Sequence, residues 1–248
     1  MRRIERTAVA ALLAALLSLA GGCAAVAPPI AAPAQASTER VGLAKLDLIE
    51  DPWEGFNRRM YRFNAWFDEA VFLPVVRGYR AVTPEFARNR VHDFFNNVAD
   101  IDTMINAALQ LQGRKTLDAL ARVTLNSTFG LLGAFDVADG LGLPQPQEDF
   151  GQTLGYWGVG SGPYLVLPLL GPSSLRDGVG RGVDFAARSA WQPDLLFGNW
   201  GQAVVMASFE AVDLRSTIAF RYYQSGSPFE YELLRLLYTK KREIDIGR

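Results

Sequence analysis

The segment from Gly162 to Pro172, GPYLVLPLLGP, is strongly apolar, but Pro168 interrupts it and it is far too short to cross a bilayer. Nevertheless, 49% of the residues in the chain are hydrophobic and only 21% are charged. Apolar side chains in this proportion need something other than water against part of the protein surface. The sequence therefore predicts a body that lies against apolar surroundings without a membrane-spanning segment.

The N-terminal residues have the order of a secretory signal. The basic start MRRIER is followed by the apolar run Thr7–Ala20 and then by small residues that lead directly into Cys23. This order is typical of a signal peptide. It also resembles a bacterial lipoprotein box, although Ala20 stands where that pattern prefers leucine. We therefore expect residues 1–22 to be a lipoprotein signal peptide.

Cys23 is the only cysteine of the chain, so it cannot form an intramolecular disulfide. We expect its thiol to accept a diacylglyceryl group and the new N-terminus to accept a further acyl chain. Two or more acyl chains anchor a protein stably, whereas one alone is marginal. Ala24 follows the cysteine, and the lack of an aspartate there favours the periplasmic face of the outer membrane. The alternative is an unmodified cysteine near a cleavage site.

The residues after Cys23 divide into a tether and a body. Residues 23–42 are rich in proline and alanine and have no packing pattern, so we expect an acylated N-terminus and a flexible tether. Residues 43–248 are expected to form a single helical domain.

The body begins with an aromatic-rich segment that is predicted to be helical. Asp51 before Pro52 suits an N-cap and a first-turn proline. The apolar residues that follow are spaced by three and four positions, which places them on one face of a helix: Trp53, Phe56, Met60, Phe63 and Phe67. Arginines lie beside this face, so it suits a helix in a membrane interface. An ordinary helix that faces the core remains the alternative.

Further helices are predicted from capping signals and spacing, and strand alternation is scarce. We expect helices that start at Thr83–Pro84, at Arg114, at Ser173 or Ser174 and at Asn199, and a last one after a capping box at Ser227–Glu230. Thirteen of the 23 glycines lie between Gly130 and Gly182, and residues 140–163 are predicted to be irregular. The fold class is therefore mainly α with Gly/Pro-rich loops.

The sequence gives little support to an enzyme, a metal site or a cofactor. One cysteine and one histidine, His92, exclude His–Cys and two-His zinc sites. Gly158–Gly162 has neither the spacing of a phosphate loop nor that of a nucleophile elbow. Asp100 with Asp102 is expected to lie on a solvated helix face, and Glu148 with Asp149 on a surface loop. A net charge of −1 gives no electrostatic footprint for nucleic acid.

Three stretches together resemble the VacJ/MlaA family of outer-membrane lipoproteins. They are DPWEGFNRRMYRFN (residues 51–64), RVTLNSTFGLLGAFDVA (residues 122–138) and EDFGQTLGYWGVGSGPYLVLPLLGPSSLRD (residues 148–177). The resemblance covers the chain from about Asp51 to Tyr238. It implies a ring-like helical domain that lies in one membrane leaflet around a central amphipathic channel.

The same resemblance implies the function and the partners. The family removes mislocalised phospholipids from the outer leaflet and passes them to a periplasmic carrier of an ABC-transporter pathway, and it associates with trimeric porins. It implies no catalytic residue, no metal and no cofactor. As the alternative function, we consider an interaction lipoprotein that stabilises a porin-containing envelope complex without moving lipid. Candidate residues for the channel mouth or for lipid contact are the glycines of the third stretch: Gly155, Gly158, Gly160 and Gly162.

Overall fold

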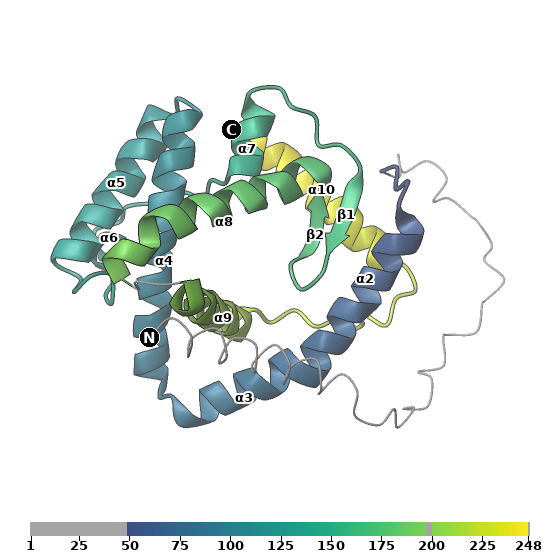
Figure 1. Cartoon of the computed structure of the whole chain (residues 1–248), viewed down its shortest axis with the longest axis horizontal. Helices are drawn as coiled ribbons and strands as arrows, with labels where there is room; N and C mark the ends of the chain where they lie inside the picture. Colours follow the sequence, from purple (N-terminus) through teal and green to yellow (C-terminus); the bar gives the residue numbers. More distant parts are fainter. Residues whose placement is uncertain (1–48, 197–199, 248) are drawn as a thin grey trace, which may run out of the picture. The chain divides into compact units, whose positions relative to one another are not determined.

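The computed structural model describes residues 49–196 and 200–247, and helices carry most of them (Figure 1). A mainly helical fold is thereby confirmed. The signal peptide, Cys23 and the tether lie outside the described residues. The elements in chain order are α2 (Glu54–Phe67), the π-helix η2 (Asp68–Phe72), α3 (Leu73–Val82), α4 (Glu85–Leu109), α5 (Gly113–Thr128), α6 (Val137–Gly140), α7 (Phe150–Tyr156), β1 (Tyr164–Leu167), β2 (Gly171–Ser174), α8 (Leu175–Leu196), α9 (Trp200–Thr217) and α10 (Glu230–Ile246).

Most helix starts lie close to the predicted positions, but two predicted caps are wrong. Trp53, not Asp51, is the N-cap of α2 and makes no side-chain cap bond. The Asp51 carboxylate accepts instead from Asn57 Nδ2 at 2.7 Å and from the hydroxyl of Tyr231 on α10. Asn57 lies in α2, whereas Tyr231 lies in α10, far away in the sequence. These two hydrogen bonds engage the Asp51 carboxylate, so it does not cap α2.

The capping box before α10 is also not formed. The helix begins at Glu230, and its carboxylate accepts from the Tyr61 hydroxyl at 2.5 Å and from Tyr223 N at 2.6 Å. Ser227 Oγ accepts from Phe229 N at 3.2 Å. Because Glu230 serves a tertiary network that ties α10 to α2, it does not reach back to cap its own helix.

Residues 140–163 are not irregular throughout, because they contain the short helix α7. Asp149 caps this helix by accepting from Gln152 N at 2.8 Å. The apolar segment that follows is extended and forms an antiparallel hairpin in which Tyr164 pairs with Ser174. Ser174 also caps α8, since its Oγ accepts from Asp177 N at 3.1 Å.

Gly180, inside α8, permits the close approach of α7. A Cβ on Gly180 would lie 2.4 Å from Gly151 N and 2.7 Å from Gly151 Cα. Glycine in a helix is destabilising on its own, so this backbone contact explains its presence.

We expect Gly180→Ala to destabilise the protein, because the added methyl group would meet the backbone of Gly151. The free energy of unfolding should fall by about 1–3 kcal/mol, the usual cost of overpacking. Gly182→Ala in the same helix is the matched control. No atom lies within 4 Å of the added Cβ there, so this change should stabilise the helix by about 0.5–1 kcal/mol. Thermal unfolding followed by circular dichroism in detergent micelles measures both, and equal melting temperatures would contradict the packing argument.

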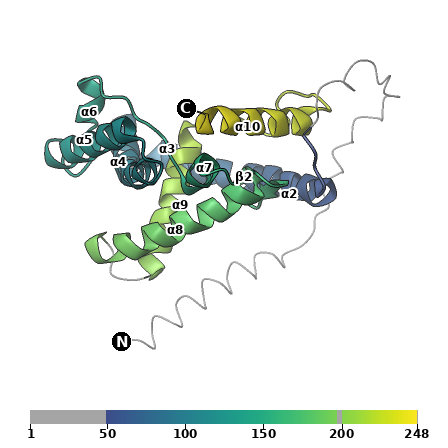
Figure 2. The ribbon, with the colours of Figure 1, turned by 90° about the horizontal axis from the view of Figure 1, so that it is seen from above.

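The described helices and strands make a closed circuit of contacts (Figure 1). Helix α2 contacts β1, both strands of the hairpin contact α8, α8 contacts α9, and α9 contacts α3, which continues from α2 through η2. Helix α4 packs on α5, α7 and α9. Helix α10 contacts α7 and β2 and lies to one side of them (Figure 2). The circuit joins segments that are far apart in the sequence.

The distribution of polar and apolar side chains is inverted compared with a water-soluble domain. The buried apolar residues include one small packed cluster of Tyr61, Tyr164, Val166 and Tyr231. By contrast, the largest fully buried side chains of the described residues are mostly polar or charged: Arg122, Gln110, Val166, Asn57, Asn126, Asp100, Asp213 and Ser173.

Large apolar side chains lie on the outside instead. Val82 is 81% exposed, Leu111 73% and Phe129 71%. Among the described residues, no helix has the length and hydropathy needed to cross a membrane.

Candidate functional site

The polar interior is held together by buried ion pairs. Arg122 is 1% exposed, and its guanidinium lies 3.0 Å from Asp100 Oδ2 and 2.6 Å from Asp136 Oδ2. Its Nη1 also donates to Leu143 O at 3.1 Å. Burial raises the pKa of Asp100, because it disfavours the charged carboxylate. A buried charge of this kind is tolerated only when it is paired and hydrogen-bonded.

A cavity of about 590 Å³ opens beside this interior, where α4, α7, α8 and α10 come together. Most of the residues that line it have polar or charged side chains. The full lining consists of Asn96, Ala99, Asp100, Asp102, Thr103, Lys115, Gln145, Pro146, Gln147, Glu148, Asp149, Gln152, Asp184, Arg188, Lys241, Arg242 and Asp245. We call this space the polar cavity.

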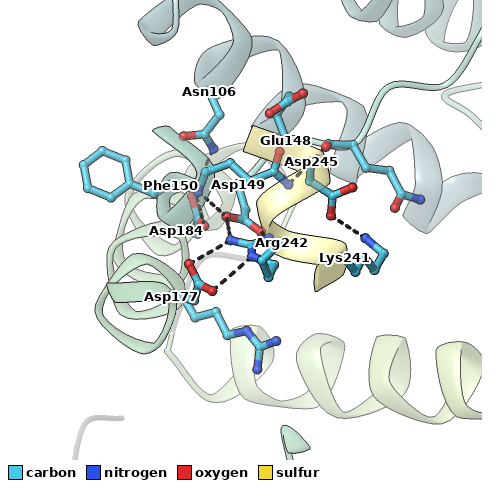
Figure 3. Close-up of polar contacts among 12 residues, drawn as sticks. Asn106, Glu148, Asp149, Phe150, Asp177, Asp184, Lys241, Arg242 and Asp245 are labelled. Carbon is cyan, nitrogen blue, oxygen red and sulfur yellow. Dashed lines mark hydrogen bonds and ion pairs between the residues drawn. The ribbon is translucent and has the colours of Figure 1, made fainter. Parts of the chain in front are cut away.

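Arg242 of α10 joins two carboxylates at the wall of the polar cavity (Figure 3). Its Nη1 and Nη2 lie 2.7 and 2.8 Å from the two oxygens of Asp149. Its Nε and Nη2 each lie 3.0 Å from an oxygen of Asp177. The Tyr238 hydroxyl donates to the same Asp177 carboxylate at 2.6 Å. Bidentate contacts of this type are among the stronger hydrogen bonds in proteins.

A second cavity of about 350 Å³ lies on the other side of this cluster. Arg242 lines both cavities, Asp149 lines only the polar cavity, and Asp177 lines only the second. The ion cluster of Arg242, Asp149 and Asp177 therefore forms part of the wall between the two spaces.

Asp177 makes the stability of this cluster sensitive to acid. Although burial acts to raise its pKa, the hydrogen bonds from Arg242 and Tyr238 outweigh that effect and lower the pKa to about 2. A carboxylate with a depressed pKa contributes stability that is present above its unfolded pKa and is lost as the pH falls through the folded value.

We expect the wild-type chain to lose stability as the pH falls from about 4 to about 2. Asp177→Asn should be less stable than wild type at neutral pH and should lose less on acidification, because it has no carboxylate to protonate. Melting temperatures measured across this pH range test the assignment. Parallel curves for the two proteins would show that Asp177 does not carry the acid sensitivity.

The remaining cavity carboxylates, apart from Asp184, are paired with cations. Lys115 pairs with Glu148, and Lys241 lies 2.6 Å from Asp245. Arg188 bridges Asp102 of α4 and Glu210 of α9, with Nε 2.8 Å from Asp102 Oδ2 and Nη1 2.8 Å from Glu210 Oε1. The predictions that Asp100 with Asp102 and Glu148 with Asp149 are solvated surface residues were wrong. Tertiary partners, which the sequence does not place, pair all four carboxylates, and three of them are largely buried, whereas the Asp149 side chain stays 38% exposed.

Asp184 of α8 has neutral donors instead. Its oxygens accept from Asn106 Nδ2 at 3.1 Å and from Phe150 N at 3.0 Å. Burial raises the pKa of this carboxyl group, and the charge of Arg188 acts on it only at longer range. Within the part of the chain that the structure describes, Asp184 makes no ion pair.

His92 pairs with a buried carboxylate. Its Nδ1 lies 2.9 Å from Asp213 Oδ2, and Asp213 also accepts from the Tyr79 hydroxyl at 3.3 Å. The three residues come from α4, α9 and α3, so they tie these helices together. Among the described residues, no group of histidine, cysteine and acidic side chains has the arrangement of a metal site.

The predicted interfacial residues of α2 lie mostly on its outer face. Trp53, Phe56 and Phe63 are 42%, 47% and 38% exposed, while Met60 and Phe67 are half-buried. The opposite face of α2 is polar and faces the hairpin. Its Asn57 donates to Tyr164 O at 3.0 Å and its Asn64 to Leu167 O at 2.9 Å.

The four predicted channel-mouth glycines have different surroundings. Gly155 lies in α7, where a Cβ would meet Ile246 Cδ1 at 2.6 Å. Gly158 has a φ of +89° and, like Gly160, has no atom within 4 Å of an added Cβ. Gly162, with a φ of +65°, is the one that lines a described cavity, the second one.

The site residues that sequence reasoning missed are Arg242, Asp177, Asp184 and Gln152. Arg242 belongs to the basic run TKKR, and its partners Asp149 and Asp177 lie far away in the sequence. One signal for this site was present in the sequence. Glu148 and Asp149 form an acidic pair directly before a helix, and both residues line the polar cavity.

A helical body with buried ion pairs, a polar cavity and an apolar exterior defines a class of protein that lies against or within apolar surroundings. The chain belongs to the MlaA lipoprotein family, whose model matches residues 49–245.

Several relatives support this assignment. An uncharacterized protein of Rickettsia prowazekii is 41% identical over 129 residues, which are 52% of this chain and 51% of the relative. The chain thus spans about half the length of this relative. The intermembrane phospholipid transport system lipoprotein MlaA of Escherichia coli is 35% identical over 173 residues, or 68% of this chain and 66% of that protein. The protein of the same name in Shigella flexneri is 36% identical over equal shares.

A solved structure has a similar fold. It comes from work on the structural basis for maintenance of bacterial outer membrane lipid asymmetry, with a TM-score of 0.65 and 29% sequence identity. The match covers 79% of this chain and 99% of that chain.

Proposed function

We propose that this chain is an outer-membrane lipoprotein that maintains lipid asymmetry by removing mislocalised phospholipids from the outer leaflet. The observation that carries the proposal is the inverted distribution of side chains, with ion pairs inside and large apolar side chains outside. Relatives named as lipoproteins of an intermembrane phospholipid transport system support it. The function is transport without chemistry, so no residue has a catalytic role.

The proposed placement is a ring of helices in one membrane leaflet around a central amphipathic channel. The closed circuit of contacts among α2, the hairpin, α8, α9 and α3 supports this arrangement. The apolar exterior suits the acyl chains of the leaflet, and the polar cavity suits headgroups.

The physical basis of such transport is the cost of burying polar groups. An amide or hydroxyl group without a hydrogen-bond partner costs roughly 2–7 kcal/mol in an apolar medium, and a charged group costs more. A lipid that changes leaflet must carry its headgroup through hydrocarbon. A polar passage in an apolar body lowers this barrier, because it supplies hydrogen-bond partners along the way.

The same proposal covers the anchor and the partners. Acylated Cys23 holds the body at the periplasmic face of the outer membrane, and residues 23–42 serve as its tether. Phospholipids are the cargo, a trimeric porin is the outer-membrane partner, and a periplasmic lipid carrier of an ABC-transporter pathway receives the cargo. The outer face of α2, with Trp53, Phe56 and Phe63, lies in the interface. The glycines from Gly155 to Gly162 shape the mouth of the passage.

A second candidate function is an interaction lipoprotein that stabilises a porin-containing complex without moving lipid. The tip after α5 favours it, because Phe129, Leu131 and Leu132 are 71%, 69% and 69% exposed and could contact a protein. Purified protein that carries phospholipid and passes it to a periplasmic lipid carrier supports transport. Protein that binds a porin but carries and passes no phospholipid supports the second candidate.

We expect the outer face of α2 to contact acyl chains near the headgroups. Trp66, which is 60% exposed in α2, provides a second probe beside Trp53. Variants that keep only Trp53 or only Trp66, with the other tryptophans changed to phenylalanine, are reconstituted in vesicles of brominated phospholipid. Bromine quenches indole fluorescence on contact, so both variants should be quenched relative to unbrominated vesicles. Fluorescence that is the same in the two kinds of vesicle would contradict the proposed placement.

A further inference from the structure

The polar cavity has a surplus of hydrogen-bond acceptors. Six carboxylate side chains line it, against four cationic ones. The cations are already engaged: Lys115, Lys241 and Arg188 by the carboxylates described above, and Arg242 by Asp149 and Asp177. An anion that entered this space would meet excess negative charge with no free cation to receive it.

Among the described residues, Asp184 is the one carboxylate of the polar cavity that has no cationic partner. It is held in place by Asn106 and by the backbone amide of Phe150, which are both neutral (Figure 3). Because two neutral donors fix its position, the carboxylate is oriented without the help of a cation. It thus offers a placed negative charge at the wall of the cavity.

Gln152 gives a second and independent observation. Gln152 is 4% exposed and lines the polar cavity, yet its side-chain oxygen Oε1 has no hydrogen-bond partner. Its other polar groups are used, since Nε2 donates to Gln147 O at 3.3 Å and the backbone N donates to Asp149. Buried polar atoms are nearly always paired, so this oxygen is a place where a ligand can donate.

We propose that the polar cavity receives the protonated amine of a zwitterionic phospholipid headgroup, with the Asp184 carboxylate and Gln152 Oε1 as its acceptors. The inference rests on the proposed function, which supplies the phospholipid. A primary ammonium group has three donors and no acceptor, which matches a wall rich in acceptors. About 590 Å³ lies in the usual range for a small-molecule pocket and leaves room for a headgroup.

The test measures which lipid the full-length acylated protein retains. Protein in non-ionic detergent is incubated with equimolar phosphatidylethanolamine and phosphatidylglycerol, and the bound lipids are extracted and quantified by mass spectrometry. Wild type should retain the ethanolamine lipid in about tenfold excess, a factor that corresponds to ~1.4 kcal/mol. Retention at parity, or an excess of phosphatidylglycerol, overturns the inference but leaves phospholipid transport intact. Retention of neither lipid counts against both the inference and the proposed function.

Two variants and a control locate the effect. Asp184→Asn removes the charge, and Gln152→Met removes the unpartnered oxygen with little change of shape. Each should bring the lipid ratio close to parity. Asp118→Asn on α5, which lies outside the polar cavity, should keep the wild-type ratio. If Gln152→Met folds and melts normally but keeps the tenfold excess, the oxygen is not a ligand acceptor and the inference is wrong.

Competition separates the possible sources of the cation. Soluble O-phosphoethanolamine should displace the ethanolamine lipid only at far higher concentration than the lipid itself, because it lacks the acyl chains. Displacement at equal concentration would identify a free amine as the ligand and overturn the lipid assignment. Displacement by Mg²⁺ alone would identify a divalent-cation site and overturn it as well.

Discussion

Arg122→Met should destabilise the protein by about 3–5 kcal/mol, because it removes one partner of a buried ion pair and leaves the other charge uncompensated. The side chains of Arg122 and Asp100 are each 1% exposed, so water cannot take the place of the lost guanidinium. The change also removes the contacts to Asp136 and to Leu143 O. Thermal and denaturant unfolding in detergent micelles measure the loss.

Arg114→Met is the matched control in the same helix. The Arg114 side chain is 91% exposed and lies 4.0 Å from Asp118, and exposed pairs contribute about 0–1 kcal/mol. We expect little change in stability. If both variants unfold like wild type, the polar interior does not hold the fold together.

Arg242→Met should have the second large effect, because it leaves two carboxylates beside each other. Asp149 and Asp177 both rely on the Arg242 guanidinium, although Arg176 also pairs with Asp177 at 2.9 Å. We expect a loss of about 3–5 kcal/mol at neutral pH. Because protonation of the two carboxyl groups relieves their repulsion, the difference from wild type should shrink in acid.

The conservative variant and an exposed neighbour make this prediction specific. Arg242→Lys keeps the charge but lacks the planar guanidinium that bridges both carboxylates, so it should recover only part of the stability. Lys240→Met removes an exposed pair with Glu243, whose side chains are 60% and 57% exposed, and should have little effect. A full recovery by lysine would show that charge alone, without the bidentate geometry, maintains the cluster.

The helices could be predicted from the sequence where local signals decide. The start of α4 after Pro84 and the span of α5 from Gly113 to Thr128 follow from proline, glycine and apolar spacing. These features depend on residues close together in the chain. The antiparallel pairing of β1 with β2 was not predicted, although a short apolar run interrupted by proline suits an extended segment.

The caps at Asp51 and Glu230 could not be predicted, because long-range partners compete for the same carboxylates. Asp51 is taken by Tyr231, and Glu230 by Tyr61 and Tyr223. Local capping rules assume that the acidic side chain has no better donor. In this chain, tertiary hydrogen bonds supply one.

The polar cavity could not be predicted for a different reason. Spacing identifies a polar helix face but does not say whether it faces water or the interior. For Asp100 and Asp102 the usual expectation is solvent, and the structure instead gives them Arg122 and Arg188. If the surroundings of the protein are apolar, the polar face of a helix turns inward. To predict which way the face with Asp100 and Asp102 points, one must therefore know the surroundings, and the composition only suggests them.

The central claim is that this body moves phospholipid out of the outer leaflet, and surface-exposed phospholipid in living cells tests it most directly. Cells that lack the protein are compared with cells that express wild type, using a probe that labels only outer-leaflet phospholipid. Loss of the protein should raise the label, and expression of wild type should restore it. Equal labelling with and without the protein would contradict the account.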